Sequence, residues 1–418
     1  MTFYTSGLKT HLIDPIHDST NFQSEFRLKS DTVYLSNLRL ANIGAKVNTA
    51  APYNPLAGAA AIIKSIHLYD GNQMLDQILE FPVWAGWTSY NTPNQKNVDA
   101  QKTLARSNMG FTYSDADRPA TDGSAYQPTH AKIQKHFAPL DSNTNADADT
   151  QTATAWLSLK TMLPMLDASL YLPTTVYKDL RLVIQYNTDV TQVANGARSL
   201  TSIEPLLIAD EITSVDKQDS IGKSYNGVSF RAIEHDRVVV PLQNSGNAGD
   251  VQSQTYTVNG FDNKNVGRML IVNTPSNATV IDNDDAKGLG SHSQYNQIIQ
   301  LRVNGQNRFW KNGISRPNER LATLTDTWGT CNSIPGGSDI GIANATNIIH
   351  NNAALTASFD YFGAHIGDEV VELQIDYSRE VSHAAQPDRY KQMLRLNLFG
   401  EVLKQISVSG SRYNIAYA

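Results

Sequence analysis

LRLVIQYN at residues 180–187 is matched by VELQIDYS at residues 371–378, and this pair gives the strongest indication of the fold class. In both stretches apolar and polar residues alternate, as they do when successive side chains of a β-strand point to opposite faces. A second pair, IIKSIHLYDGNQ at residues 62–73 and IIQLRVNGQN at residues 298–307, indicates an apolar strand that enters a glycine turn. Because each pair has one member in each half of the chain, we predict two β-sandwich units of similar size.

The rest of the apolar pattern is also of the strand type. Short alternating or continuous apolar runs recur at residues 32–40, 231–242, 254–258, 268–272, 297–303, 394–398 and 405–408. Helices are expected only at residues 98–106, 153–166 and 388–396, none of which has a long amphipathic stripe. Long loops rich in Asn, Asp, Ser, Thr and Gly separate the strands. We therefore predict an all-β chain with long loops and a few short helices, divided near Ile212.

Composition speaks against several classes of protein. The 418 residues carry 34 Lys and Arg against 40 Asp and Glu, a net charge of −6, which does not suit a basic nucleic-acid-binding domain. Cys331 is the single cysteine, so an intrachain disulfide and a multi-cysteine metal site are ruled out. No apolar run approaches the about 20 residues that span a bilayer. Met1 to Gly7 lack the features of a secretory signal, and we expect synthesis in a reducing intracellular compartment.

No motif for catalysis or cofactor binding is complete. Lys217 stands where a phosphate-binding loop at residues 217–224 would need its first glycine. The acidic run at residues 282–285 lacks the turn glycine and the closing glutamate of a calcium loop. Carboxylates within residues 368–376 would serve a glycosidase only at a separation that sequence does not give. We predict no catalytic, cofactor-binding or metal-binding residue.

Aromatic residues follow both glycine hairpins. Trp84 and Trp87 lie in FPVWAGWTSY at residues 81–90, and Phe309 and Trp310 come directly after the second hairpin. Large apolar side chains at similar places in both halves indicate core or domain-interface packing. A subunit-contact patch and a carbohydrate platform are the alternatives.

Four features occur in a characteristic order along the chain. They are FRL at residues 26–28 with VYLSNLRL at 33–40, IKSIHLYDGN at 63–72, YLP at 171–173 before LRLVI at 180–184, and IEPLLI at 203–208. In this order and spacing the chain resembles the double jelly-roll major capsid proteins of tailless icosahedral double-stranded DNA viruses, the lineage of polinton-like viruses, virophages and giant viruses.

The resemblance implies two tandem eight-stranded antiparallel jelly-roll sandwiches, at residues 25–212 and 213–408, with an N-terminal arm at 1–24 and a C-terminal tail at 409–418. It implies a structural protein and no enzyme: a homotrimer that forms pseudo-hexagonal capsomers in an icosahedral virion, with penton and minor capsid proteins as further partners. It implies no cofactor, small-molecule substrate or specific nucleic acid, and it does not assign an internal membrane. Polar loops within residues 89–152 and 276–352 would form outward towers or intersubunit contacts.

Two other interpretations are kept beside this one. A penton or minor capsid protein with a single jelly roll would share many strand features but leaves the second strand-rich half unexplained. A carbohydrate-binding β-sandwich protein or glycosidase would use Trp84, Trp87 and Trp310 as sugar platforms.

Overall fold

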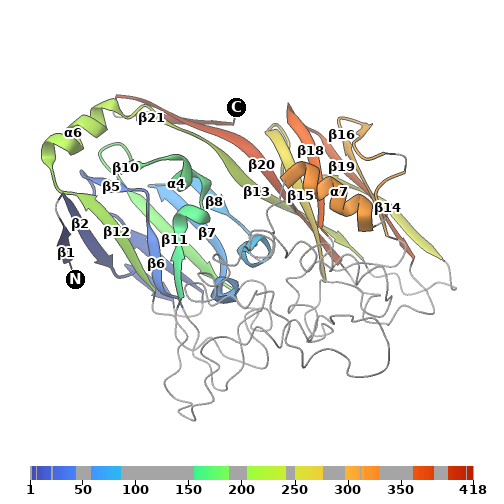
Figure 1. Cartoon of the computed structure of the whole chain (residues 1–418), viewed down its shortest axis with the longest axis horizontal. Helices are drawn as coiled ribbons and strands as arrows, with labels where there is room; N and C mark the ends of the chain where they lie inside the picture. The colour runs from blue at the N-terminus through green and yellow to red at the C-terminus, as the bar shows by residue number, and fades with distance from the viewer. Residues whose placement is uncertain are drawn as a thin grey trace, which may run out of the picture.

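The structure is a computed structural model that describes residues 2–5, 7–19, 22–43, 58–85, 155–187, 205–241, 250–275, 297–310, 312–315, 317–328, 361–380, 394–410 and 412–417. Strands dominate these ranges and lie in four sheets, whose named strands all pair antiparallel. The sheets form two sandwiches that stand side by side (Figure 1). The predicted all-β class with few short helices is confirmed.

The second sandwich has eight principal strands in two sheets. One sheet has the order β13-β20-β15-β18 and the other the order β14-β19-β16-β17. Counted from its first strand, the orders are therefore 1-8-3-6 and 2-7-4-5, which is the arrangement of a jelly roll. The strands are β13 (Gly227–Val240), β14 (Val251–Val258), β15 (Asn265–Pro275), β16 (Ile298–Val303), β17 (Gln306–Asn307), β18 (Tyr361–Val370), β19 (Leu373–Glu380) and β20 (Leu394–Ser409).

The first sandwich repeats this order with two broken strands. One sheet pairs β2 with β12, β12 with β5 and β6, β5 with β10, and β6 with β9, while the other runs β4-β11-β7-β8. β5 and β6 together take the third position, and β9 and β10 the sixth. The strands are β2 (Leu8–Ile13), β4 (Gln23–Arg27), β5 (Val33–Leu35), β6 (Arg39–Ile43), β7 (Ile63–Asp70), β8 (Gln73–Ile78), β9 (Ala155–Ser158), β10 (Tyr171–Pro173), β11 (Leu180–Tyr186) and β12 (Leu206–Ile212); short strands β1 (Thr2–Thr5) and β3 (His17–Ser19) extend the edges at β2 and β4.

The two sequence echoes occupy equivalent places in the two sandwiches. Residues 62–73 cover β7, the turn and the start of β8, and residues 298–307 cover β16 and β17, the fourth and fifth strands of each unit. Residues 180–187 contain β11 and residues 371–378 cover most of β19, and these are both seventh strands. The predicted duplication is confirmed.

Three local expectations differ from the structure. Within the segment assigned to an N-terminal arm, β2 pairs with β12 from Leu8 to Ile13 inside the first sandwich. Within the assigned C-terminal tail, β21 (Arg412–Tyr417) folds back onto β20. The helix expected at residues 153–166 is wrong: β9 comes first, a 3₁₀ helix (Leu159–Thr161) follows, and Pro164 begins the separate helix α4 (Pro164–Ala168) because proline is tolerated at a helix start and breaks a helix interior. The helix expected at residues 98–106 lies outside the described residues. Of the helix expected at residues 388–396, the part before Leu394 also lies outside them, and Leu394 begins strand β20.

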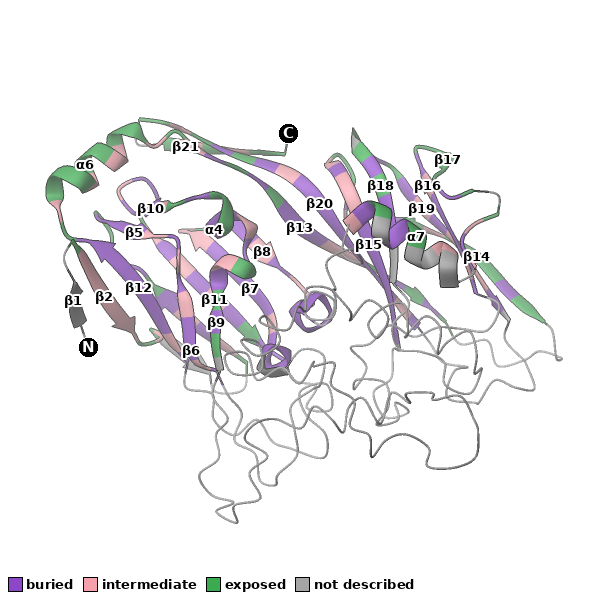
Figure 2. Cartoon of the chain, in the orientation of Figure 1, coloured by how far each residue is buried: buried purple, intermediate pink, exposed green. Residues whose placement is uncertain are grey.

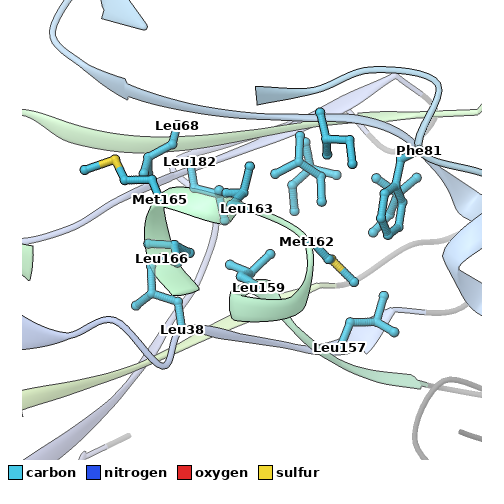
Figure 3. Packing of buried hydrophobic residues seen from close by; sticks show 14 of the residues in the cluster. Leu38, Leu68, Phe81, Leu157, Leu159, Met162, Leu163, Met165, Leu166 and Leu182 are labelled. Atoms are coloured by element: carbon cyan, nitrogen blue, oxygen red, sulfur yellow. The ribbon is translucent and has the colours of Figure 1, made fainter. Parts of the chain in front are cut away.

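The helices between β9 and β10 close the core of the first sandwich. Figure 3 shows their side chains set among residues from strands and loops of the same unit. Leu159, Leu163, Met165 and Leu166 have no exposed surface. The helices at the break in the sixth strand thus place apolar side chains in the core of the first sandwich.

Two long strands of the second sandwich also cover the first. β13 pairs with β20 from Gly227 to Val240, whereas the pairing of β15 with β20 ends at Val402 and β21 takes its place from Lys404. We call residues 227–233, 403–409 and 412–417 the connecting ribbon; in Figure 1 it runs from the second sandwich across the first toward α6 (Val215–Ser224). Within the ribbon, burial alternates along β13 from Gly227 to Ala232 and along β20 from Leu403 to Ser407, whereas residues 396–402 of β20 are all buried (Figure 2). The inward side chains Val228, Phe230, Ala232 and Ile406 belong to the core of the first sandwich.

Candidate assembly surfaces and the junction between the sandwiches

Trp84 lies at the contact between the two sandwiches. It follows β8 of the first unit and is 8% exposed. Its ring centre lies 5.3 Å from that of Phe399 on β20 and 5.9 Å from that of Trp328 at the end of α7 (Pro317–Trp328). These separations are typical of tilted and edge-to-face aromatic pairs. Trp84 is therefore placed to hold the units together, and its burial does not suit an open sugar platform.

Phe309 and Trp310 point in different directions after the second hairpin. The side-chain amide of Gln300 on β16 holds this segment: Gln300 Nε2 donates to the carbonyl of Phe309 at 3.1 Å, and the Phe309 N–H donates to Gln300 Oε1 at 3.0 Å. Phe309 enters the core of the second sandwich at 5% exposure, whereas Trp310 is 47% exposed. Trp310 is thus available as a contact residue. Trp87 lies outside the described residues.

Arg268 of β15 makes a second set of contacts beside Trp84. Its Nε and Nη2 donate to the two carboxylate oxygens of Glu401 on β20, both at 2.7 Å, and Nη1 donates to the carbonyl of Thr327 at 3.1 Å. The guanidinium also lies 4.1 Å from the centre of the Trp328 ring. A planar guanidinium can satisfy all three contacts at once, which a lysine ammonium cannot do. Arg268 thereby fixes the end of α7 against the sheet.

A group of buried charges lies where the connecting ribbon meets β8 and α4. The Asp76 side chain is fully buried, and its carboxyl accepts hydrogen bonds from the N–H groups of Met165 and Gln77, both at 2.9 Å. Burial raises the pKa of Asp76 to about 7, against the opposing influence of these hydrogen bonds and of Lys404. Lys404, at 2% exposure, has its pKa lowered by burial.

Three further polar groups surround this point, Glu234 on β13, Lys264 before β15 and Tyr417 on β21. Tyr417 Oη donates to Glu234 Oε1 at 3.2 Å, and Lys264 Nζ lies 3.5 Å from Glu234 Oε2. The Nζ atoms of Lys264 and Lys404 lie 5.3 and 5.4 Å from the centre of the Tyr417 ring. Burial raises the pKa of Tyr417 to about 12, so its hydroxyl stays protonated as the donor to Glu234. We call Asp76, Glu234, Lys264, Lys404 and Tyr417 the junction cluster.

A separate network holds the first strand of the first sandwich. Glu211 of β12 contacts His11 Nε2 at 2.6 Å and accepts from Thr32 Oγ1 at 2.7 Å. Gln218 of α6 donates to the same threonine hydroxyl at 3.0 Å. Burial acts to raise the pKa of Glu211, but the hydrogen bonds from Thr32 and His11 and the nearby positive charges bring it below its ordinary value. These contacts bind β2 and α6 to the end of the sandwich.

The described residues contain no cluster of three or more His, Cys, Asp or Glu that could hold a metal ion. None of the described helices is long and apolar enough to cross a membrane. Cys331, the acidic run at 282–285 and nearly all of the polar loops within 89–152 and 276–352 lie outside the described residues. The sequence did not single out Asp76, Lys404 or Arg268, because only the pairing of distant strands brings their partners to them.

Comparison with protein-family models found no match, and comparison with curated proteins found none. Comparison with solved structures defines the fold as the double jelly roll of viral major capsid proteins. A crystal structure of PBCV-1 Vp54, fitted into a reconstruction of the virophage Sputnik, has a TM-score of 0.57 at 9% identity and covers 98% of this chain and 96% of its own. The Faustovirus major capsid protein has a TM-score of 0.52 at 9% identity, and the match covers 96% of this chain and 90% of that one. The mavirus major capsid protein has a TM-score of 0.50 at 7% identity, and the match covers 98% of this chain and 90% of that one.

Proposed function

We propose that this chain is a structural major capsid protein that assembles as a homotrimer into pseudo-hexagonal capsomers of an icosahedral virion. The observation that carries the proposal is the pair of sandwiches with one strand order, joined in a single chain by the connecting ribbon. Three such chains around a threefold axis present six similar sandwiches, which suits a six-neighbour lattice. The near-full coverage of viral capsid structures supports the same role.

The proposal includes the partners and the place of action. The main partner is the chain itself, first in the trimer and then in the lattice, with penton and minor capsid proteins at its borders. The protein acts in the virion after synthesis in the host. We assign it no reaction, cofactor, small-molecule substrate or specific nucleic acid.

The native mass of the purified protein tests the trimer. Light scattering coupled to gel filtration is expected to give a peak near three times the chain mass of 46.0 kDa. Negative-stain images of that peak are expected to show hexagonal outlines. A protein that stays monomeric at high concentration and under crowding would contradict the proposal and make a glycan screen the next step.

Trp310 is proposed as a residue of the subunit contact because it is a large exposed apolar side chain. Trp310→Ala is expected to shift the equilibrium from trimer toward monomer at a fixed concentration. Trp156→Ala is a matched control, because Trp156 on β9 is exposed to a similar extent, 48% against 47%. Equal trimer fractions in both variants would remove Trp310 from the contact while leaving the trimer to be judged by its mass.

The other interpretations fit the structure less well. A single jelly roll with an insertion does not account for a second half that is itself an eight-stranded jelly roll. A sugar platform built on Trp84 does not suit a side chain that packs against Phe399 and Trp328.

A further inference from the structure

The junction cluster combines features that make its charge state matter for the contact between the sandwiches. Asp76 belongs to β8 of the first sandwich, and Glu234 and Lys404 belong to β13 and β20 of the second. Asp76 is bonded to two backbone N–H groups, and its ionised form would sit in a site without exposed surface. Placing a charge there is costly unless water gains access or a counter-ion closes on it.

The groups around Asp76 act on it in opposite directions. Lys404 favours the ionised carboxyl and Glu234 disfavours it, while burial outweighs both. From the other elements packed against β8, β7 contributes His67, which pairs with Gln77 across the strands, and α4 contributes Asp167, whose side chain is 75% exposed. Within the cluster, Lys264 and Tyr417 contact the carboxylate of Glu234. The pKa of Asp76 therefore stands at about 7, near neutrality.

We propose that the junction cluster is a proton-controlled lock between the two sandwiches: proton uptake by Asp76 in mildly acidic solution seats the connecting ribbon more firmly on β8 and α4. When Asp76 is ionised, opening of the ribbon hydrates the carboxylate and is favoured. When Asp76 is neutral, opening does not gain the free energy of hydrating a carboxylate, and the junction stays closed. The lock belongs to the single chain and does not depend on the proposed trimer.

The direction follows from the linkage between proton binding and opening. The closed junction holds Asp76 with a pKa of about 7, whereas an opened, hydrated Asp76 has the ordinary value of 3.8. Because the pKa is raised in the closed state, protonated Asp76 stabilises the closed junction. This stabilisation is fully present below pH 3.8 and is lost as the pH rises to about 7. Between pH 5 and pH 7 the opening equilibrium constant is expected to rise about fifty-fold. Burial lowers the pKa of His67, of His235 and of Lys404, so these groups act in the opposite direction to Asp76. Both histidines are kept in every variant compared.

Hydrogen exchange of the full-length protein tests the lock. The amides to follow are those of the connecting ribbon and of Met165, at pH 5 and pH 7 after correction for intrinsic exchange rates. The contribution of Asp76 is expected to appear as the difference between wild type and Asp76→Asn, about fifty-fold in the change of opening between pH 5 and pH 7, because the Asn side chain does not ionise in this range. Equal pH dependence in wild type and Asp76→Asn overturns the proposal.

Two further variants keep the test decisive if Asp76→Asn folds poorly. Lys404→Met removes the positive charge that favours the ionised carboxyl, so the midpoint of the pH dependence is expected to move upward; an unchanged midpoint contradicts the lock. Asp210→Asn is the matched control, because Asp210 is a buried aspartate paired with Arg39 away from the junction. It is expected to keep the wild-type pH dependence.

Discussion

Replacement of Trp84 by alanine probes the junction between the sandwiches directly. The side chain is 8% exposed and packs on Phe399 and Trp328 of the other sandwich. An aromatic side chain of this kind buries about 150–250 Å², which at about 25 cal/mol/Å² corresponds to roughly 4–6 kcal/mol. Partial collapse of the site recovers some of this, so we expect Trp84→Ala to lower the free energy of unfolding by about 3–5 kcal/mol.

Urea denaturation followed by far-UV circular dichroism measures this change without relying on tryptophan fluorescence. Because Trp84 joins the units, the variant is also expected to unfold over a broader range or in two steps, where wild type unfolds in one. Trp156→Ala is the control and should change the free energy of unfolding by less than about 1 kcal/mol, since Trp156 is 48% exposed. A cost below about 1 kcal/mol for Trp84→Ala, or an equal cost for Trp156→Ala, would refute the assignment of Trp84 to the junction.

Two further substitutions test contacts in the second sandwich. Arg268→Lys keeps the charge but loses the two-point bond to Glu401 and the stacking on Trp328, so thermal unfolding should show a loss of about 1–2 kcal/mol; stability equal to wild type would show that charge alone matters. Gly400→Ala would place a Cβ atom 2.5 Å from Phe261 Cε1 and is expected to cost about 1–3 kcal/mol in urea denaturation. Gly222→Ala in α6 meets only Thr175 Oγ1 at 3.2 Å and should be neutral or stabilising; an equal loss in both glycine variants would contradict the packing argument.

The strand segments and the duplication of the sandwich were largely predictable from the sequence. Alternation marks strands locally, and two pairs of similar stretches identified equivalent positions in the two units before any pairing was known. The same local signals did not reveal β20 as one strand. Residues 394–398 and 405–408 were predicted as separate runs, whereas the structure makes them one strand through Gly400, where Phe261 packs close to the backbone.

The candidate aromatic residues show a different limit of sequence reasoning. Trp84 and Trp310 follow equivalent hairpins, and the sequence predicted similar roles for them. In the structure Trp84 is covered by α7 and β20, whereas Trp310 is turned outward by the bonds between Gln300 and Phe309. The burial of Trp84 depends on Trp328 and Phe399, more than 200 positions away, and no local sequence pattern indicates these contacts. The buried charges Asp76 and Lys404 were missed for the same reason.

The connecting ribbon also sets the timing of folding during synthesis. The core of the first sandwich needs Ile406, although its last own strand ends at Ile212. At about 5–20 residues per second the ribosome needs roughly 10–40 s to make the intervening chain. Throughout this interval the nascent first half holds an unfinished core with apolar surface open to solvent. We therefore expect the first sandwich to complete its core only late in translation, when Ile406 has been made.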